Sequence, residues 1–203
     1  EAFEAETGKP AVDSIHIKGH LYFDWAWKLA RNPNLVGAIA DLVGEDLFIM
    51  ASRFWIKDPQ DHKYVSWHQD HAYFGLKPPT IITAWLALNE VTPHNGCMRV
   101  IPGSHKLGRL AHSSGQEFSE FMEKNYPLEG AKIIEAEAGD VLFFHYLTIH
   151  GSKPNRSTSV RKNVLVQLHA GNDRVEPGNG HVNSKLVLRG WSQVASSSYC
   201  ESH

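Results

Sequence analysis

The stretch Trp67-His68-Gln69-Asp70 places an imidazole and a carboxylate two positions apart, within a run that alternates as a β-strand does. Side chains at positions i and i+2 of a strand point to the same face, so His68 and Asp70 are expected to lie side by side. Two histidines and one carboxylate on one face of a ferrous ion leave three coordination positions open, which is typical of oxygen-activating iron sites. The pair therefore predicts part of a metal site, with a hydrogen-bonded structural pair as the alternative.

The third ligand has to come from a distant part of the chain, and three histidines compete for this role. His150 follows the apolar run from Val141 to Phe144, His145 lies directly after that run, and His169 ends a later one. A strand-like run can present any of them to the same cavity. The residues alone leave this choice open.

Arg161 stands eleven residues after His150, at the start of another apolar run. A guanidinium that emerges from a buried strand needs an anionic partner, because an unpaired buried charge is very costly. The far carboxylate of 2-oxoglutarate is such a partner, and the planar fork of arginine fits it with two parallel hydrogen bonds. A salt bridge to an acidic side chain is the alternative.

Two helices are predicted ahead of the residues that carry this chemistry. Apolar residues recur at helix-like intervals from Leu21 to Val43, and Pro33 interrupts them. The second helix is expected to begin near Asn32 or Pro33, with the asparagine as its cap. Another short helix is expected from Glu117 to Lys124.

Short strands are expected to make up most of the remaining chain, because apolar or alternating runs follow one another with turn residues between them. The expected strands are Leu47–Ile56, Val65–Tyr73, Thr80–Leu88, Met98–Ile101, Lys132–Ala136, Val141–Phe144 and Val164–His169. Asn95-Gly96 is a strong turn signal, so the runs ending at Leu88 and beginning at Met98 are expected to form a hairpin. A loop from Gly171 to Gly180 and a last run around residues 185–188 follow.

The bulk composition favours one domain over residues 1–203, with helices at about 21–44, a β core at about 47–170 and a C-terminal loop and strand at 171–203. The 20 basic and 22 acidic residues form no run of like charge, so neither nucleic acid nor an anionic membrane is an expected partner. No apolar run reaches the roughly 18 residues of a membrane span. Cys97 and Cys200 suggest neither a disulfide framework nor a thiolate zinc site, which fits a reducing, cytoplasmic setting.

Several motifs in order resemble the phytanoyl-CoA dioxygenase family, from about Leu35 to His169. They are Trp67-His68-Gln69-Asp70, Thr83-Ala84-Trp85-Leu86-Ala87-Leu88, Asn95-Gly96-Cys97-Met98, Ile101-Pro102-Gly103-Ser104-His105, and His150-Gly151-Ser152 with Pro154, Asn155 and Arg161. The resemblance implies a mostly β fold with flanking helices, the double-stranded β-helix, which is a cupin-like jelly roll.

The resemblance also implies the site. His68, Asp70 and His150 would bind iron, and Arg161 would bind 2-oxoglutarate; the glycine and serine after His150 fit the family pattern, whereas nothing comparable follows the other two histidines. It further implies that Trp85 lines the co-substrate pocket. Gln69 and Ser152 would supply hydrogen bonds near it. The alternative is a core aromatic for Trp85 and local backbone caps for Gln69 and Ser152.

The expected function is hydroxylation of a C–H bond by an iron(II)- and 2-oxoglutarate-dependent dioxygenase that consumes O2 and releases succinate and CO2. Asp70 is present, which favours hydroxylation over halogenation. A small metabolite or natural-product intermediate is favoured as substrate, because the balanced charge marks no large basic surface for coenzyme A. The alternatives are an acyl-CoA hydroxylase of the same family, a cupin-type isomerase or dioxygenase without 2-oxoglutarate, and a non-enzymatic β-barrel binding or scaffold protein. Arg161 disfavours the cupin-type enzymes. Desaturation or cyclisation and the oligomeric state stay open.

Overall fold

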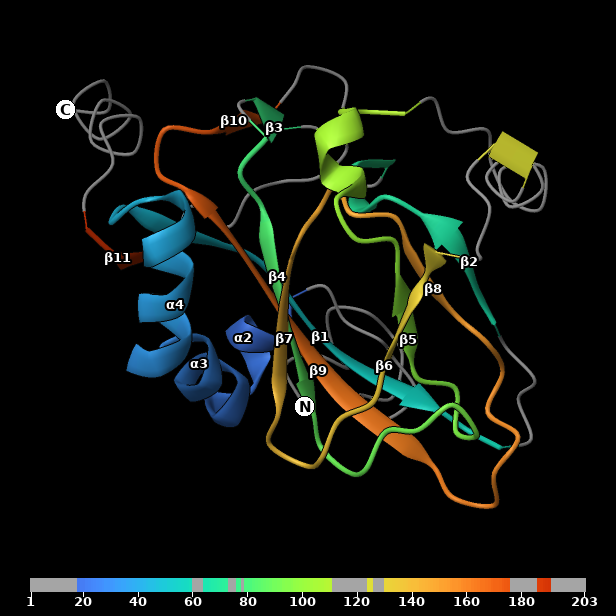
Figure 1. The fold of residues 1–203 in the computed structure, drawn as a ribbon. Helices are drawn as coiled ribbons and strands as arrows, with labels where there is room; N and C mark the ends of the chain where they lie inside the picture. Colours follow the sequence, from blue (N-terminus) through green and yellow to red (C-terminus); the bar gives the residue numbers. More distant parts are fainter. Residues whose placement is uncertain are drawn as a thin grey trace, which may run out of the picture.

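Two antiparallel sheets make up the core of the protein in the computed structural model, which describes residues 18–59, 64–72, 76–77, 79–110, 124–125, 130–175 and 186–190. The larger sheet has the order β11-β1-β9-β4-β7, and the smaller one has the order β2-β8-β5-β6 (Figure 1). The strands of the larger sheet are β11 (Val187–Arg189), β1 (Leu47–Lys57), β9 (Arg161–Ala170), β4 (Ile82–Ala87) and β7 (Val141–His145). Those of the smaller sheet are β2 (Val65–His68), β8 (His150–Ser152), β5 (Met98–Val100) and β6 (Lys132–Ile134). A short pair, β3 (Leu76–Lys77) with β10 (Arg174–Val175), lies apart from them.

The chain passes repeatedly from one sheet to the other. From β4 in the larger sheet it enters β5 and β6 in the smaller one, returns to β7, crosses to β8 and returns again to β9. This winding is the double-stranded β-helix, so the predicted fold class is confirmed.

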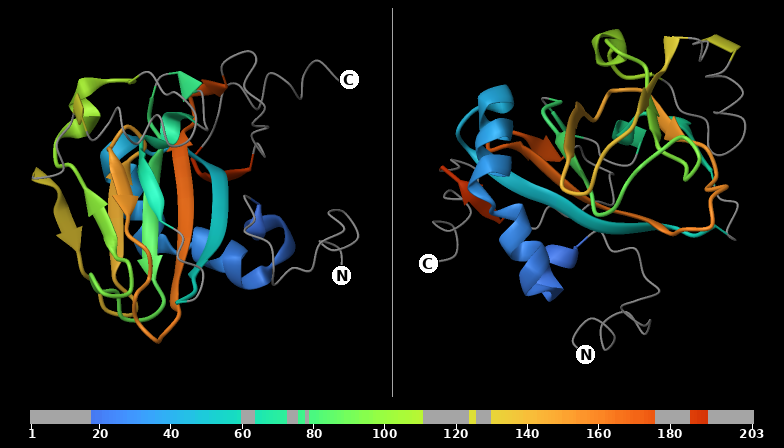
Figure 2. Two further views of the ribbon diagram at one scale, coloured as in Figure 1. Left: turned by 90° about the vertical axis from the view of Figure 1, so that its right-hand side faces the viewer. Right: turned by 60° about the horizontal axis from the view of Figure 1, so that its bottom comes forward.

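Three helices cover the outer face of the larger sheet, opposite the smaller sheet (Figures 1 and 2). They are α2 (Gly19–Tyr22), α3 (Asp24–Ala30) and α4 (Pro33–Val43). Alternate residues of β9, such as Val164 and Val166, pack in one core cluster with Ile39 of α4. The intervening β9 residues therefore point to the inner side of the sheet, between the two sheets. Among the described helices none is long and apolar enough to cross a membrane.

The prediction of the second helix is confirmed, whereas the first predicted helix differs from the structure. Asn32 caps α4 as expected, since its side-chain oxygen accepts from the backbone N–H groups of Asn34 and Leu35 at 3.0 and 3.4 Å. The first predicted helix is instead two helices, because Phe23 between α2 and α3 has extended backbone angles. The helix expected from Glu117 to Lys124 lies almost entirely outside the described residues.

The predicted hairpin between the runs ending at Leu88 and beginning at Met98 is wrong. β4 pairs with β7 and β9, whereas β5 pairs with β6 and β8, so the two runs belong to opposite sheets. Asn95-Gly96 does form a tight turn, in which the Asn95 side chain accepts from the backbone N–H of Thr92 at 2.9 Å. That turn carries the chain from one sheet to the other. The turn is closed by its own hydrogen bonds, and the strands on either side of it do not pair with each other.

Other expectations about the strands also need correction. The short strands β3 and β10 were not expected, and β10 lies within the predicted loop from Gly171 to Gly180. The strand expected over Val65–Tyr73 ends at His68, and Asp70 instead begins a 3-10 turn, Asp70–Ala72. The strand β8 was not expected, because three residues are too few for an alternating pattern to be read. The last two differences fall at predicted metal ligands, since Asp70 begins the turn after β2 and His150 begins β8.

Gly96 is a position where the fold requires glycine. Its φ is +80°, and an added Cβ would lie 2.6 Å from the carbonyl oxygen of Lys153. Gly139 has φ +100° but would meet nothing within 4 Å. We expect Gly96→Ala to lower the free energy of unfolding by about 3 kcal/mol and Gly139→Ala by about 1 kcal/mol, because only the first adds a backbone clash to the left-handed strain. Urea unfolding of both variants measures this, and equal losses would contradict it.

His20 fixes α2 to β1, and burial makes this contact sensitive to acid. Its backbone N–H donates to the Ser52 hydroxyl at 2.7 Å, and its Nδ1 lies 2.9 Å from the same oxygen. Burial, with a smaller effect of Lys18, lowers the pKa of His20 to about 4 from 6.5. The unfolded chain therefore takes up this proton first, so the stability from His20 is complete above pH 6.5 and is lost as the pH falls towards 4.

We expect the free energy of unfolding of His20→Gln to depend less on pH in acid than that of the wild type. The free energy of unfolding of the wild type should fall more steeply than that of the variant between pH 6.5 and pH 4, because glutamine does not titrate. Urea unfolding of the metal-free proteins at several pH values measures the difference. The other histidines are present in both proteins, so parallel profiles would show that His20 does not contribute.

Candidate active site

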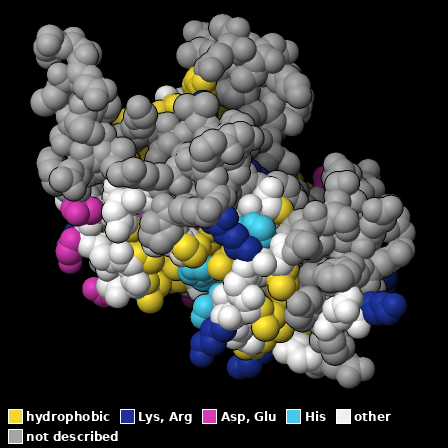
Figure 3. Space-filling model, turned by 90° about the horizontal axis from the view of Figure 1, so that it is seen from above, with side chains coloured by type: hydrophobic (Ala, Val, Ile, Leu, Met, Phe, Trp, Pro, Cys, Tyr) yellow, Lys and Arg dark blue, Asp and Glu magenta, His cyan; other side chains and the backbone are white. Residues whose placement is uncertain are grey.

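A cavity of about 380 Å³ lies between the two sheets, within the size range of small-molecule sites. It is lined by Arg53, Trp55, Tyr64, Val65, Ser66, His68, Asp70, Trp85, Met98, Phe144, His150, Gly151, Ser152, Arg161, Asn163, Leu165 and Gln167. Seen from above, several histidine side chains lie near one another on the surface, with Lys and Arg side chains beside them (Figure 3). Both sheets thus contribute polar side chains to one cavity.

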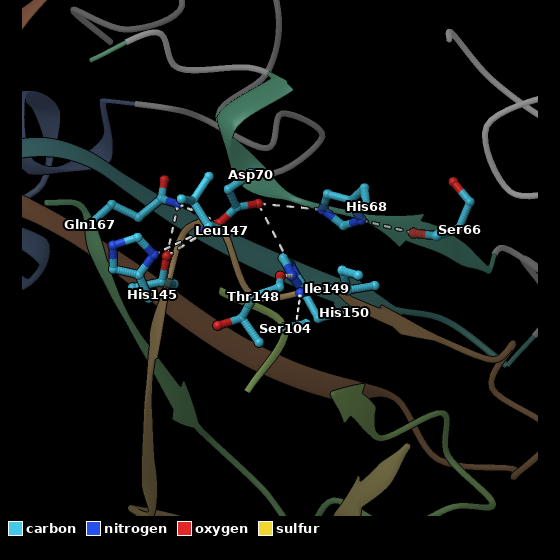
Figure 4. Close-up of polar contacts among 11 residues, drawn as sticks. Ser66, His68, Asp70, Ser104, His145, Leu147, Thr148, Ile149, His150 and Gln167 are labelled. Atoms are coloured by element: carbon cyan, nitrogen blue, oxygen red, sulfur yellow. Dashed lines mark hydrogen bonds and ion pairs between the residues drawn. The ribbon is translucent and has the colours of Figure 1, made fainter. Parts of the chain in front are cut away.

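His68, Asp70 and His150 come together in this cavity. The strand pair β2 and β8 sets His68 opposite His150, and Asp70 follows at the turn after β2. Asp70 Oδ1 lies 3.3 Å from His68 Nε2 and 3.6 Å from His150 Nε2, and the carboxylate faces both rings from one side (Figure 4). The three ligand atoms lie within 4.8 Å of one another, which is close enough for all of them to contact one metal ion.

Backbone carbonyls orient both imidazoles. Nδ1 of His68 lies 2.8 Å from the carbonyl oxygen of Ser66, and Nδ1 of His150 lies 2.8 Å from that of Thr148. A carbonyl only accepts, so each Nδ1 carries the proton and donates. The lone pair of each Nε2 is therefore directed at the space beside Asp70. Such an outer hydrogen bond fixes the tautomer and ring orientation of a metal-binding histidine.

The other carboxylate oxygen of Asp70 is held from the larger sheet. Asp70 Oδ2 accepts from Gln167 Nε2 at 3.0 Å and from Thr83 Oγ1 at 3.3 Å, which leaves Oδ1 towards the histidines. Gln167 and Thr83 were not predicted. One signal could have found Gln167, because Arg161, Asn163 and Gln167 are polar residues at even spacings on the otherwise apolar strand β9 and so share its inner face.

The charges of the cluster suit a divalent metal. Burial would raise the pKa of Asp70, but the facing imidazoles of His150 and His68 outweigh it and hold the pKa at about 2. Burial and the neighbouring His68 lower the pKa of His150 to about 4. At neutral pH the site thus offers an ionised carboxylate and a neutral His150. Two imidazoles and one carboxylate with open positions fit ferrous iron.

The two competing histidines lie outside the cluster. Both ring nitrogens of His145 contact the backbone, since Nε2 lies 2.9 Å from the carbonyl oxygen of Pro79 and Nδ1 accepts from the N–H of Leu147. His169 stacks on Phe48 at 5.5 Å between ring centroids, and its Nδ1 meets the Ala170 carbonyl at 2.9 Å. Of the three candidates, only His150 lies beside His68 and Asp70.

Arg161 is 3% exposed and lines the same cavity. Its Nη1 donates to the carbonyl oxygen of Gly96 and its Nη2 to Asn163 Oδ1 at 3.1 Å, while its Nε is buried without a hydrogen bond. Burial lowers its pKa to about 10, which leaves it protonated at neutral pH. Within the described part of the chain no carboxylate lies within 4 Å of it, so the alternative of a salt bridge is not found there. A buried cation in this state fits an anionic ligand.

Of the other three predicted site residues, Trp85 and Ser152 line the cavity and Gln69 does not. Trp85 lines the cavity, and the guanidinium of Arg161 lies 5.8 Å from its ring centroid, so the aromatic ring packs beside the cation. Ser152 also lines the cavity. Gln69 does not: its amide donates to the carbonyls of Gly108 and Leu147, and its oxygen accepts from a backbone N–H. The structure therefore favours the backbone role for Gln69.

The fold and the cluster together define the class. A double-stranded β-helix that brings two histidines and a carboxylate into a cavity with a buried arginine has the design of the iron- and 2-oxoglutarate-dependent oxygenases. A family model described as phytanoyl-CoA dioxygenase matches residues 2–163. The chain belongs to the phytanoyl-CoA dioxygenase family.

Relatives in this family act on different compounds according to their names. A probable alpha-ketoglutarate-dependent hypophosphite dioxygenase of Stutzerimonas stutzeri is 33% identical over 174 residues, which cover 81% of this chain and 60% of that protein. A probable phytanoyl-CoA dioxygenase of Caenorhabditis elegans is 33% identical over 160 residues, which cover 72% of this chain and 51% of that protein. The chain thus spans about half of the length of the curated relatives that it matches.

Solved structures share the fold. The non-haem monooxygenase ThoJ aligns with a TM-score of 0.76 at 24% identity, over 98% of this chain and 80% of its own. The alpha-ketoglutarate-dependent carbocyclase SnoK from nogalamycin biosynthesis aligns with a TM-score of 0.64 at 29% identity, over 76% of this chain and 62% of its own. The first likeness supports the architecture alone, and the second is to an enzyme whose own name states dependence on alpha-ketoglutarate.

Proposed function

We propose that this protein hydroxylates a C–H bond of a small metabolite or natural-product intermediate, with iron(II), 2-oxoglutarate and O2, and releases succinate and CO2. One observation carries the proposal: a buried cluster of two histidines and one aspartate shares its cavity with a buried arginine that has no carboxylate partner in the described chain. The cluster would hold the metal, and the arginine would hold the far carboxylate of the co-substrate.

Each residue has a defined task in this proposal. His68, Asp70 and His150 hold iron(II) on one face, in the protonation states that their hydrogen bonds already impose. Bound iron(II) would bind and activate O2, whose four electrons of reduction come in equal parts from the oxidative decarboxylation of 2-oxoglutarate and from the substrate C–H bond. Arg161 fixes the far end of the diacid, and Trp85 beside it keeps water from the guanidinium.

A small substrate fits the available space better than an acyl-CoA thioester. The cavity of about 380 Å³ has to receive both 2-oxoglutarate and the reacting part of the substrate. Asp70 occupies the position of the carboxylate ligand, which favours hydroxylation over halogenation. Arg161 favours 2-oxoglutarate chemistry over a cupin-type reaction that has no need of this cation. The relatives' names indicate substrates that differ too widely to identify the small molecule on which this protein acts.

Anaerobic titration tests the proposal directly. The purified protein is titrated with ferrous iron and then with 2-oxoglutarate, and a weak visible charge-transfer band is expected when the diacid chelates the metal. Exposure to oxygen with a panel of metabolites should then release succinate. A folded protein that shows neither the band nor succinate would favour a binding or scaffold role instead.

A further inference from the structure

Gln167 has a buried hydrogen-bond acceptor beside the proposed metal ligands. Its Nε2 donates to Asp70 Oδ2 and to Thr83 Oγ1, both at 3.0 Å. A carboxylate only accepts, so the amide nitrogen has to face Asp70, which leaves the amide oxygen for another partner. Gln167 lines the cavity, and within the described part of the chain its Oε1 is buried without a hydrogen bond. Because a buried acceptor in this state is costly, Oε1 is suited to a donor from a bound molecule.

Arg53 lies near this acceptor on the same face of the larger sheet. It pairs in register with Leu165, and Gln167 is two residues further along β9, so Arg53 and Gln167 are diagonal neighbours. Such neighbours lie about 7–8 Å apart, within reach of long side chains. Both residues line the cavity. The guanidinium and the amide oxygen can therefore contact one small molecule from the same wall.

Arg53 is well separated from the proposed co-substrate end. Arg161 pairs with Lys57, which is four residues after Arg53 on β1. At about 3.3 Å per strand residue, the two arginines start about 13 Å apart along the sheet. An anion held by Arg53 is therefore a different group from the far carboxylate of 2-oxoglutarate.

The charges of the cavity favour an anionic substrate. Among the described residues that line it, Arg53 and Arg161 are cations and Asp70 is the one carboxylate. In the proposed function, iron(II) adds two positive charges and 2-oxoglutarate adds two negative ones, so an excess of one positive charge stays. A guanidinium has five N–H donors, so Arg53 can bind an anion in addition to its contacts within the protein. One negative charge on the substrate would balance the cavity.

We propose that Arg53 and Gln167 form the subsite for the organic substrate, which is a small anion with a hydroxyl or amino group beside its negative charge. This inference rests on the proposed function and names its substrate class. Arg53 holds the negative group with its planar fork, and Gln167 Oε1 accepts from the hydroxyl or amino group. Since Gln167 also donates to Asp70, a molecule bound here lies next to the metal ligands.

Three probes with the same carbon chain separate the two contacts. 2-Hydroxyhexanoate has both the charge and the donor, hexanoate has only the charge, and 2-hydroxyhexanamide has the donor without the charge. Their affinities are measured by anaerobic calorimetry on protein loaded with ferrous iron and 2-oxoglutarate. The visible band of the loaded protein is followed in parallel, so that a probe that displaces 2-oxoglutarate is recognised.

Matched variants show which residue makes each contact. Arg53→Met removes the charge, and Arg53→Lys keeps it without the fork; Arg99→Met is the control, because Arg99 does not line the cavity. Gln167→Met removes the acceptor together with a hydrogen bond to Asp70. Thr83→Val removes only a hydrogen bond to Asp70, so it controls for that second effect. Thermal melting and iron titration check every variant.

We expect the wild type to bind 2-hydroxyhexanoate most tightly and 2-hydroxyhexanamide most weakly. Arg53→Met should weaken the binding of both acids about tenfold or more and that of the amide less than threefold, because hydrogen bonds to charged groups are the strong ones. Arg53→Lys should lose less. Gln167→Met should weaken 2-hydroxyhexanoate about fivefold and leave hexanoate unchanged. Arg99→Met and Thr83→Val should keep the wild-type affinities.

Other results overturn the inference. A wild type that binds the amide as tightly as the acids, or binds none of the three probes, has no such subsite, and this comparison needs no variant to fold. An Arg53→Met protein with wild-type affinities would exclude Arg53, and equal losses for the two acids in Gln167→Met would place its effect on Asp70. A wild type without the visible band would instead reject the proposed function before any probe is added, so the two failures can be told apart.

Discussion

Replacing Asp70 by glycine is expected to reduce succinate formation to the background of metal-free protein and to weaken ferrous iron binding by more than about a hundredfold. Loss of an outer hydrogen-bond partner of a metal ligand already costs about 10- to 100-fold in affinity or activity, and here a charged ligand itself is lost. The change also removes the carboxylate oxygen that accepts from Gln167 and Thr83, so these two side chains keep only the hydrogen bond from Gln167 Nε2 to Thr83 Oγ1. Two neutral imidazoles would then face the metal alone.

Iron binding is measured by anaerobic titration, and succinate by its release from 2-oxoglutarate under oxygen. His145→Gln is the matched control, because His145 lies five residues before His150 but uses both ring nitrogens on the backbone. It should bind iron as the wild type does. If Asp70→Gly kept the wild-type affinity while His145→Gln lost it, the ligand set would be different from the one proposed here.

His68 and Asp70 could be singled out from the sequence as candidate metal ligands because they lie within one short motif. The spacing of His68 and Asp70 is enough to bring them close even though the expected strand ends before Asp70. The long, strongly apolar runs also gave β1, β4 and β9 close to their observed limits. Length and hydrophobicity are the features from which a strand can be recognised without its partners.

Pairing between distant strands could not be predicted in the same way. Asn95-Gly96 signals a turn, but whether the flanking strands pair depends on which sheet each one joins, and that is decided by contacts far along the chain. β8 has only three residues, which is too short for a pattern in its own sequence. It is a strand because it pairs with β2 and β5. The choice of His150 over His145 rested on the family resemblance for the same reason.

The residues that support the site were missed because their roles depend on the fold. Thr83 and Gln167 lie on neighbouring strands of the larger sheet and meet at one carboxylate oxygen of Asp70. Lys57 is read from the sequence as a polar residue at the end of a strand, yet the structure buries it against Ser152. The identity of a polar residue does not tell which backbone or side chain will satisfy it.

Replacing Arg161 by alanine is expected to weaken 2-oxoglutarate binding by about a hundredfold or more and to leave iron binding intact. Truncating one member of a buried, hydrogen-bonded charge pair costs about 2 to 5 kcal/mol, and each 1.4 kcal/mol is tenfold in affinity. Arg161 is buried, protonated and without a carboxylate partner within the described chain, so a diacid would be its natural counter-ion. Arg161→Lys keeps the charge without the planar fork and should give an intermediate affinity.

The measurement is the anaerobic titration of iron-loaded protein with 2-oxoglutarate, followed by the same titration with 2-oxopentanoate. The loss in Arg161→Ala should be confined to 2-oxoglutarate, because only this ligand has the far carboxylate that the guanidinium would bind. Arg156→Ala, a change at an exposed arginine in the preceding loop, should bind both ligands as the wild type does. An Arg161→Ala protein that is folded, binds iron and keeps the wild-type affinity for 2-oxoglutarate would show that another group anchors the diacid, because a buried cation that contacts a carboxylate cannot be removed without cost.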